Sequence, residues 1–142
     1  MAGETTSLSA AEARTFYDNV GAGVFAAVFT KSFSTTQNEL NDVMEMGYIP
    51  ANTRVLSIGY FPTDMDTNVS PALVQKVTVN GVDQVTGLTG GQSGTSSLNA
   101  PTATAIGTTP GTDKQLVTIT STTAAATAAA GSVVLVLLCQ HI

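Results

Sequence analysis

Apolar and polar residues alternate along most of the chain from Val24 onward, and this period-2 pattern predicts a series of short β-strands. The first expected strand, Val24–Phe33, places Phe25, Ala27, Phe29, Lys31 and Phe33 on one face, with the three phenylalanines in the core. Similar alternation, or a short apolar run, predicts further strands over Asp42–Ile49, Thr53–Phe61, Leu73–Val79, Val82–Val85, Asn99–Ile106, Lys114–Thr122 and Ser132–His141.

The alternation also predicts which residues share a face. In Asp42–Ile49, strict alternation places Tyr48 on the same side as Met44 and Met46. In Thr53–Phe61 it places Val55 with Gly59 and Phe61, opposite Ile58 and Tyr60.

Turn-forming residues separate the expected strands. Asn80-Gly81 lies between two alternating segments and predicts a type I′ hairpin, since both central residues of that turn need positive φ. Gly87–Ser97 is rich in glycine and serine and is expected to form a loop. The pattern therefore predicts a mainly β domain of seven to eight strands, a β-sandwich or small barrel with jelly-roll-like topology.

The first twenty residues differ from the rest. Ser9-Ala-Ala-Glu12 has the spacing of a capping box, which predicts two helical turns over Ala10–Tyr17. The alternative is an extended arm, because residues 1–9 are small and polar. We therefore divide the chain into residues 1–20, an N-terminal arm or short helix, and residues 21–142, a β domain. Leu8, Phe16 and Tyr17 are the residues with which such an arm would contact a neighbouring subunit.

Composition narrows the functional classes. Of 142 residues only 11% are charged, the formal net charge is −5, and the five basic residues are scattered. Nucleic acids and anionic membranes require clustered Lys and Arg, so we expect neither as a partner. A single cysteine and a single histidine leave few catalytic or metal-binding combinations. We expect a protein that is not an enzyme and uses no cofactor.

Two stretches of the chain bear on targeting and membrane insertion. The N-terminus lacks the basic and apolar regions of a secretory signal, so none is expected. Ala124–Cys139 is the most apolar stretch, but it is shorter than the roughly 20 residues of a membrane helix. Its β-branched second half favours a strand.

One loop carries closely spaced oxygen ligands. Asp64, Asp66 and Asn68 match the opening of a calcium-binding loop. The sixth position is Val69 where the motif has glycine, and the twelfth is Gln75 where it has glutamate. We therefore favour a surface turn in which these side chains cap their own backbone. The alternative is a weak calcium site whose remaining ligands come from another chain.

Two other patterns contain residue types found in chemical sites. Cys139 and His141 share a strand face, but they lie roughly 7 Å apart, too far for a nucleophile–base hydrogen bond. Gly87–Gly94 is glycine-rich, yet no lysine and no helix pattern follow it, as a phosphate-binding loop would require. We expect a packed Cys139, an exposed His141 and a plain loop, with no catalytic, cofactor-binding or metal-binding residue.

The segment Asn38–Lys76 carries a series of shorter motifs. It contains N-D-V-x-x-M-G-Y-I-P, then a Val/Leu/Ile strand, then a D-x-D-T-N-x-S-P loop before another strand. The chain closes with an AAATAAAG turn and a Val/Leu strand over Ala124–Leu138. This arrangement resembles small virion proteins of tailed bacteriophages, in particular the β-rich capsid decoration, or head cement, group. Gln75-Lys76 departs from that pattern, where an acidic residue and a glycine are more usual.

The resemblance implies a structural protein of the virion, most simply a decoration protein that binds and stabilises the assembled phage head. It implies two kinds of partner, the major capsid protein and other copies of the chain, which form a homo-oligomer such as a trimer. It places the protein on the capsid surface after synthesis in the host cytoplasm. The alternative function is a receptor- or carbohydrate-binding β-sandwich module of a head fibre or tail.

Overall fold

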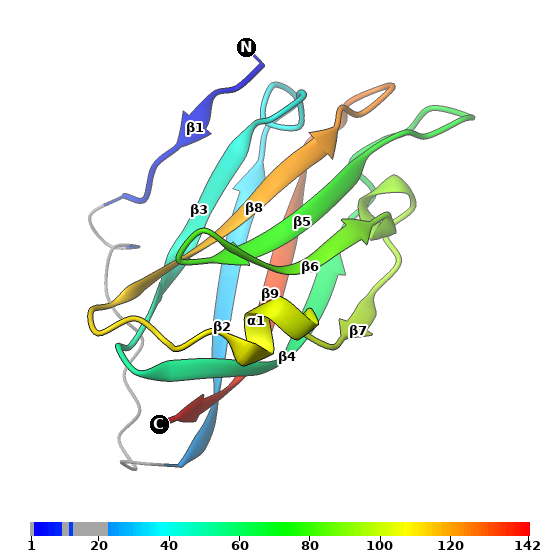
Figure 1. Ribbon diagram of the computed structural model, residues 1–142. Helices are drawn as coiled ribbons and strands as arrows, with labels where there is room; N and C mark the ends of the chain where they lie inside the picture. Colours follow the sequence, from blue (N-terminus) through cyan, green and yellow to red (C-terminus); the bar gives the residue numbers. More distant parts are fainter. Residues whose placement is uncertain (1, 10–11, 13–22) are drawn as a thin grey trace.

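The structure is a computed structural model that describes residues 2–9, 12 and 23–142. The described chain forms two β-sheets packed face to face, with one short helix at an edge (Figure 1). The elements in order are β1 (Thr5–Thr6), β2 (Val24–Phe33), β3 (Val43–Ile49), β4 (Thr53–Pro62), β5 (Val74–Val79), β6 (Val82–Leu88), the 3-10 turn η1 (Gly90–Gln92), β7 (Ser97–Asn99), α1 (Ala103–Gly107), β8 (Gln115–Thr123) and β9 (Gly131–His141).

The two sheets interleave strands from the whole length of the chain. The five-stranded sheet has the order β1-β3-β8-β5-β6, and the four-stranded sheet has the order β2-β9-β4-β7. All pairs are antiparallel except β1 with β3. The expected mainly β fold and its sandwich architecture are confirmed.

The core lies between the sheets and is built from the inward residues of the long strands. Its largest fully buried apolar side chains include Ile58 and Tyr60 of β4, Leu135 and Leu137 of β9, and Ile119 of β8. Phe33 is buried at 3% exposure, whereas Phe25 and Phe29 pack partly buried against this core. The expectation that all three phenylalanines face inward is consistent with these positions.

The hairpin expected at Asn80-Gly81 is confirmed. The β5 and β6 strands meet there with Val79 opposite Val82. Asn80 has φ 52° and Gly81 has φ 78°, so both central residues have the positive φ of a type I′ turn.

Strict alternation is wrong in β3, because the strand contains a β-bulge. Glu45 pairs with Thr118 and Gly47 pairs with Val117, which leaves Met46 as an extra residue. The extra residue reverses the parity of all residues that follow. Ile49 is therefore buried, and Tyr48 points to the other face of the sheet, where the Lys114 ammonium lies 4.3 Å from the centre of its ring.

A second β-bulge changes which residues of β4 face the core. Val55 pairs with Cys139 and Ser57 pairs with Leu138, so Leu56 is the extra residue. Val55 consequently shares the core face with Ile58 and Tyr60, rather than lying with Gly59 and Phe61 as strict alternation predicts.

The strand expected over Asn99–Ile106 is also wrong. The chain leaves β7 at Asn99 and turns into α1, whose N-cap Thr102 accepts a hydrogen bond from the Ala105 amide at 3.1 Å. Thr102 in turn donates to the Asp83 carbonyl at 2.9 Å, which ties the helix to β6. No helix among the described residues is long and apolar enough to cross a membrane.

Candidate assembly surfaces and buried polar sites

The N-terminal segment lies along the edge of its own domain. The Gly3 amide donates to the Leu40 carbonyl at 3.0 Å, and the Val43 amide donates to the Glu4 carbonyl at 2.9 Å. Further along, the Leu8 amide donates to the Glu45 carboxylate at 3.1 Å. These bonds hold residues 3–8 against β3, so Leu8, one of the candidate interface residues, is half-buried on its own chain.

The expected capping box is present in the described residues. The Ser9 amide donates to the Glu12 carboxylate at 3.0 Å, and the Glu12 amide donates to the Ser9 hydroxyl at 3.3 Å. The helix expected after it, and the candidate contact residues Phe16 and Tyr17, lie outside the described residues.

Glu12 also covers a buried lysine. Lys31 points inward from β2, an edge strand, and is 8% exposed, with its ammonium 2.7 Å from the Glu12 carboxylate. The hydrogen bond from Lys31, supported by the Ser9 amide, lowers the pKa of Glu12 to about 2. An inward charge on an edge strand discourages unspecific strand pairing, and Glu12 supplies the countercharge that this arrangement needs.

Asp66 is the centre of a clamp between two loops. Its carboxylate accepts backbone N–H groups from Ala72 at 2.7 Å, Leu73 at 3.1 Å, and Ala126 and Thr127 at 2.9 Å each. The side chain is 1% exposed. Burial alone would raise the pKa of Asp66, but these four backbone donors together hold it well below its usual range.

The three candidate calcium ligands bind groups of their own loop and of the loop around Thr127. Asp64 accepts the Asp66 amide at 3.1 Å, and Asn68 accepts the Ser70 amide at 2.9 Å while donating to Thr127 at 2.8 Å. No group of three or more His, Cys, Asp or Glu among the described residues could hold a metal ion. Asp66 differs from the expected surface turn, because it is buried and binds the backbone of a second loop as well as that of its own.

Cys139 and His141 do not form a reactive pair. Cys139 is fully buried, and burial raises the pKa of its thiol to about 12, so the nucleophilic thiolate is suppressed. His141 is half-buried opposite Thr53, and its buried Nδ1 has no hydrogen-bond partner among the described residues. The packed cysteine is as expected, whereas the histidine is less exposed than expected.

The glycine-rich segment packs as part of the core wall. Gly91 is buried, and a Cβ there would lie 3.0 Å from Leu73 Cδ2 and 3.2 Å from Met65 Cε. Its carbonyl accepts the Met65 amide at 2.8 Å, and Gln92 donates to the Leu73 carbonyl at 2.9 Å. The glycines thus allow close packing between η1 and the Asp66 loop.

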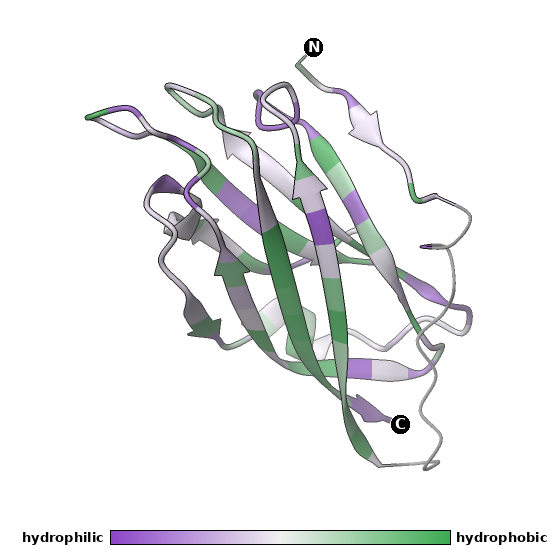
Figure 2. Cartoon of the chain, turned by 180° about the vertical axis from the view of Figure 1, so that it is seen from behind, coloured by the Kyte–Doolittle hydropathy of each residue, from purple (hydrophilic) through white to green (hydrophobic). Residues whose placement is uncertain are grey.

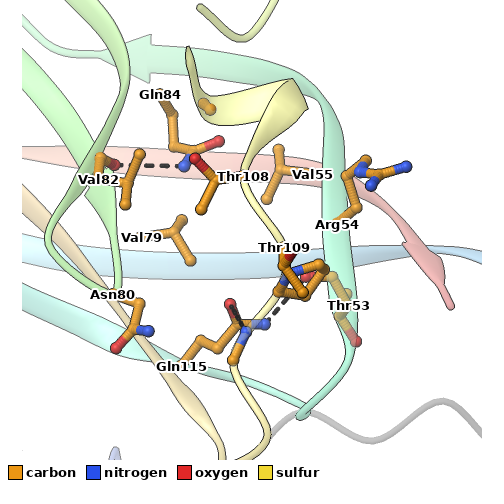
Figure 3. Close-up of a pocket in the computed structure, with 13 residues that line it drawn as sticks. Thr53, Arg54, Val55, Val79, Asn80, Val82, Gln84, Thr108, Thr109 and Gln115 are labelled. Carbon is orange, nitrogen blue, oxygen red and sulfur yellow. Dashed lines mark hydrogen bonds between the residues drawn. The ribbon is translucent and has the colours of Figure 1, made fainter.

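A small cavity lies beside α1 and the segment that follows it, and residues of β4, β5, β6 and β8 complete its lining (Figure 3). Its volume is about 40 Å³, enough for one or two water molecules and too small for an organic ligand. Gln115 crosses its floor and donates to the carbonyls of Thr53 at 2.9 Å and Pro50 at 3.1 Å. We interpret the cavity as a small gap in the packing between these elements.

The outer surface of the four-stranded sheet is apolar, and the sequence analysis missed it. We call it the outer apolar face; it includes Val24, Val28, Phe61, Leu98, Val136 and Leu138. The signal lay in the runs VFAAVF of β2 and VVLVLL of β9, which are apolar at both parities. A strand that is apolar on both faces is typical of a sheet covered on both sides.

Comparison with known proteins adds a fold likeness. No protein-family model and no curated protein matches the chain. A chain of the structure described as "Capsid of Ralstonia phage GP4" matches with a TM-score of 0.76 and 20% identity, covering 91% of each chain. A chain of "Cyanophage Pam1 capsid asymmetric unit" matches with a TM-score of 0.73 and 23% identity, covering 96% of this chain and 99% of that one. The chain is thus similar in fold, along almost its whole length, to chains of two phage capsids.

Proposed function

We propose that this chain is a virion structural protein of a tailed bacteriophage, and that it acts as a capsid decoration protein that binds and stabilises the assembled head. The observation that carries the proposal is the fold likeness to chains from two phage capsids, which covers more than nine-tenths of each chain compared. Because the match covers more than nine-tenths of both chains, the likeness in fold extends over the whole domain and is not limited to one motif.

The strand order supports the jelly-roll topology that the sequence pattern suggested. If β2 to β9 are counted as one to eight, the four-stranded sheet runs 1-8-3-6. The strands of the other sheet that belong to this count run 2-7-4-5, with β1 added at its edge. Two four-stranded sheets with this alternation form the jelly roll found in viral capsid domains.

The polar groups described above favour a structural role over catalysis. The buried carboxylate of Asp66 stabilises two loops, and the buried thiol of Cys139 is held in its unreactive form. A decoration protein needs a stable scaffold and an interface, and both requirements fit a chain with few charges and many small residues.

The proposal includes partners and location. The major capsid protein is the shell partner, and other copies of the chain form a homo-oligomer, for which a trimer at a three-fold position is our working model. The few scattered basic residues fit the outer capsid surface, away from the genome. Synthesis takes place in the host cytoplasm. We also propose that residues 1–20 help attachment, with Phe16, Tyr17 and the part of Leu8 that its own chain leaves uncovered as the contacts.

Co-sedimentation tests the proposal directly. The purified chain is mixed with capsids that lack it, from the phage that encodes it, and the bound amount is measured against the major capsid protein. Saturable binding at a fixed ratio is expected. Absence of binding, together with detection of the chain on tails or fibres of intact virions, would reject the decoration role.

One surface favours the alternative of a carbohydrate-binding module. A shallow groove of about 360 Å³ runs beside η1 and β7 and is lined by hydroxyl and amide side chains, including Thr89, Thr95 and Ser97. Neutral polar groups of this kind can bond to sugar hydroxyls. Binding of host polysaccharide without capsids, weakened by Thr95→Val, would favour this function over decoration.

A further inference from the structure

The outer apolar face is continuous across all four strands of its sheet. Val28 of β2 lies opposite Val136 of β9, Val136 lies opposite Gly59 of β4, and Gly59 lies opposite Leu98 of β7. The ring of Phe61 fills the space above Gly59, because a Cβ at Gly59 would lie 2.7 Å from Phe61 Cε2. One apolar row therefore runs from one sheet edge to the other.

Of the six side chains that define the face, all but the half-buried Val136 are exposed although they are apolar. The exposed fraction is 53% for Val28 and 80% for Leu98, at opposite edges of the sheet, and 39% for Leu138 between them. The view of Figure 2, opposite to that of Figure 1, shows the hydrophobic residues concentrated along β9 and the first half of β2. An exposed patch this continuous marks an interaction site on a soluble domain.

The strands that form the face carry no acidic residue. The chain carries ten Asp and Glu residues, yet none of them lies on β2, β4, β7 or β9. Of the two basic residues on these strands, Lys31 turns inward to Glu12, and Arg54 lies at the end of the sheet beside Gln140. A basic partner would find no acidic group on these strands, whereas a second copy could approach without bringing acidic residues together.

The size of the face fits a contact between subunits. Three strands of about ten residues and one of three cover roughly 500 Å² in projection, at about 3.3 Å per residue and 4.8 Å between strands. Because the side chains project from the sheet, the accessible area of the face is larger than this projected area. Specific interfaces begin near roughly 600 Å² per partner, so most of the face would have to be buried in one contact.

We propose that the outer apolar face is the surface through which one copy of this chain packs against another copy. The inference rests on the proposed function and deepens it, because it assigns the contact between neighbouring copies to a named surface and leaves the rest of the molecule for the capsid shell. Burial of valine, leucine and phenylalanine side chains drives the contact, and the absence of acidic groups on the sheet permits it.

The mass of the full-length chain in solution tests the inference. Sedimentation velocity over a wide range of concentrations should show a multiple of one chain for the wild type. Val28→Lys and Leu98→Lys place a charge at the two ends of the apolar row, and each should reduce the mass to that of one chain. Val69→Lys is the matched control, because Val69 is fully exposed but lies in the loop after β4, off the sheet; its mass should stay that of the wild type.

Two results would overturn the inference: a wild type that stays monomeric, or face variants that keep the wild-type mass. Circular dichroism and thermal melting show that each variant is folded before its mass is interpreted. Capsid co-sedimentation separates the two proposals. A wild-type oligomer that the face variants dissociate, but that binds no capsid, supports the inference and counts against the decoration role. Face variants that keep the oligomer but lose capsid binding reject the inference and assign the face to the shell.

Discussion

The Tyr60 hydroxyl donates a hydrogen bond to the Gln75 side-chain carbonyl across the interior of the sandwich. Tyr60 belongs to β4 of one sheet and Gln75 to β5 of the other, and both are fully buried. Gln75 continues the chain of bonds by donating to Asn38 at 3.0 Å, which also accepts the Ser121 hydroxyl at 3.3 Å. A polar network thus links the two sheets with specific geometry, at a place where apolar packing alone has no preferred register.

Tyr60→Phe should destabilise the fold by about 1–3 kcal/mol, because the Gln75 carbonyl would be left buried without its donor. The change keeps the ring and its packing, so the loss reports on the hydrogen bond. Urea denaturation followed by fluorescence or circular dichroism measures it. A variant as stable as the wild type would mean that the bond adds nothing to the sandwich.

A double-mutant cycle isolates the coupling within this network. Gln75→Leu removes the acceptor, so adding Tyr60→Phe to it should cost less than Tyr60→Phe costs alone. We expect a coupling of about 1 kcal/mol, as for residues in direct contact. Full additivity of the two changes would contradict the contact.

Asp66→Asn should be one of the most destabilising single substitutions in the chain, at about 3 kcal/mol. The asparagine keeps one oxygen, but its amide group would face backbone N–H donors, and the charge that strengthens these bonds is lost. Asp64→Asn is the matched control, since Asp64 is exposed and accepts a single backbone bond. Equal stability of the two variants would show that the clamp is not needed.

The same clamp predicts a specific response to acid. The pKa of Asp66 in the folded protein lies below its ordinary value, so its stabilisation is complete above that ordinary value and is lost as the pH falls below it. The Tm of the wild type should therefore fall more steeply below about pH 4 than that of Asp66→Asn. Parallel Tm curves for the two proteins would rule out this source of acid sensitivity.

The sequence predicted the parts of the fold that depend on local chemistry. Asn80-Gly81 identified its hairpin because few residues accept positive φ, and the long strands followed from alternation. The sequence did not predict the bulges at Met46 and Leu56. One extra residue reverses which face the following residues point to, without changing the local sequence pattern. The sequence pattern did not predict α1, because the helix is too short to show a helical period.

The candidate sites that depend on neighbouring residues could also be predicted, whereas those that join distant residues could not. The Ser9–Glu12 capping box was found, since it depends on spacing within four residues. The clamp of Asp66 on Ala126 and Thr127 joins residues about sixty positions apart, so no local pattern contains it. The outer apolar face was missed because alternation directs attention to one face of each strand, and both faces of β9 are apolar.

Gly81→Ala should lower stability by about 1 kcal/mol through backbone strain alone. Gly81 has φ 78°, which is unfavourable for any residue with a Cβ, and no atom lies within 4 Å of a Cβ built there. Gly107→Ala is the control, because that site is equally open and its φ lies outside the left-handed region. Gly107→Ala should be neutral or slightly stabilising. Thermal melting of both variants compares them, and an equal loss in both would contradict the type I′ assignment.

Deletion of residues 1–19 should leave the β domain folded and weaken its attachment to capsids. The deletion removes the bonds of residues 3–8 to β3 and the Glu12 partner of Lys31, so a small decrease in Tm is expected as well. Glu12→Gln separates the two effects, since it breaks the ion pair but keeps the segment. If Glu12→Gln lowers the Tm yet binds capsids as the wild type does, while the deletion binds weakly, the segment itself makes the contact. A deleted chain that unfolds, or one that binds with full affinity, would show that residues 1–19 serve the fold of their own domain and reach no neighbour.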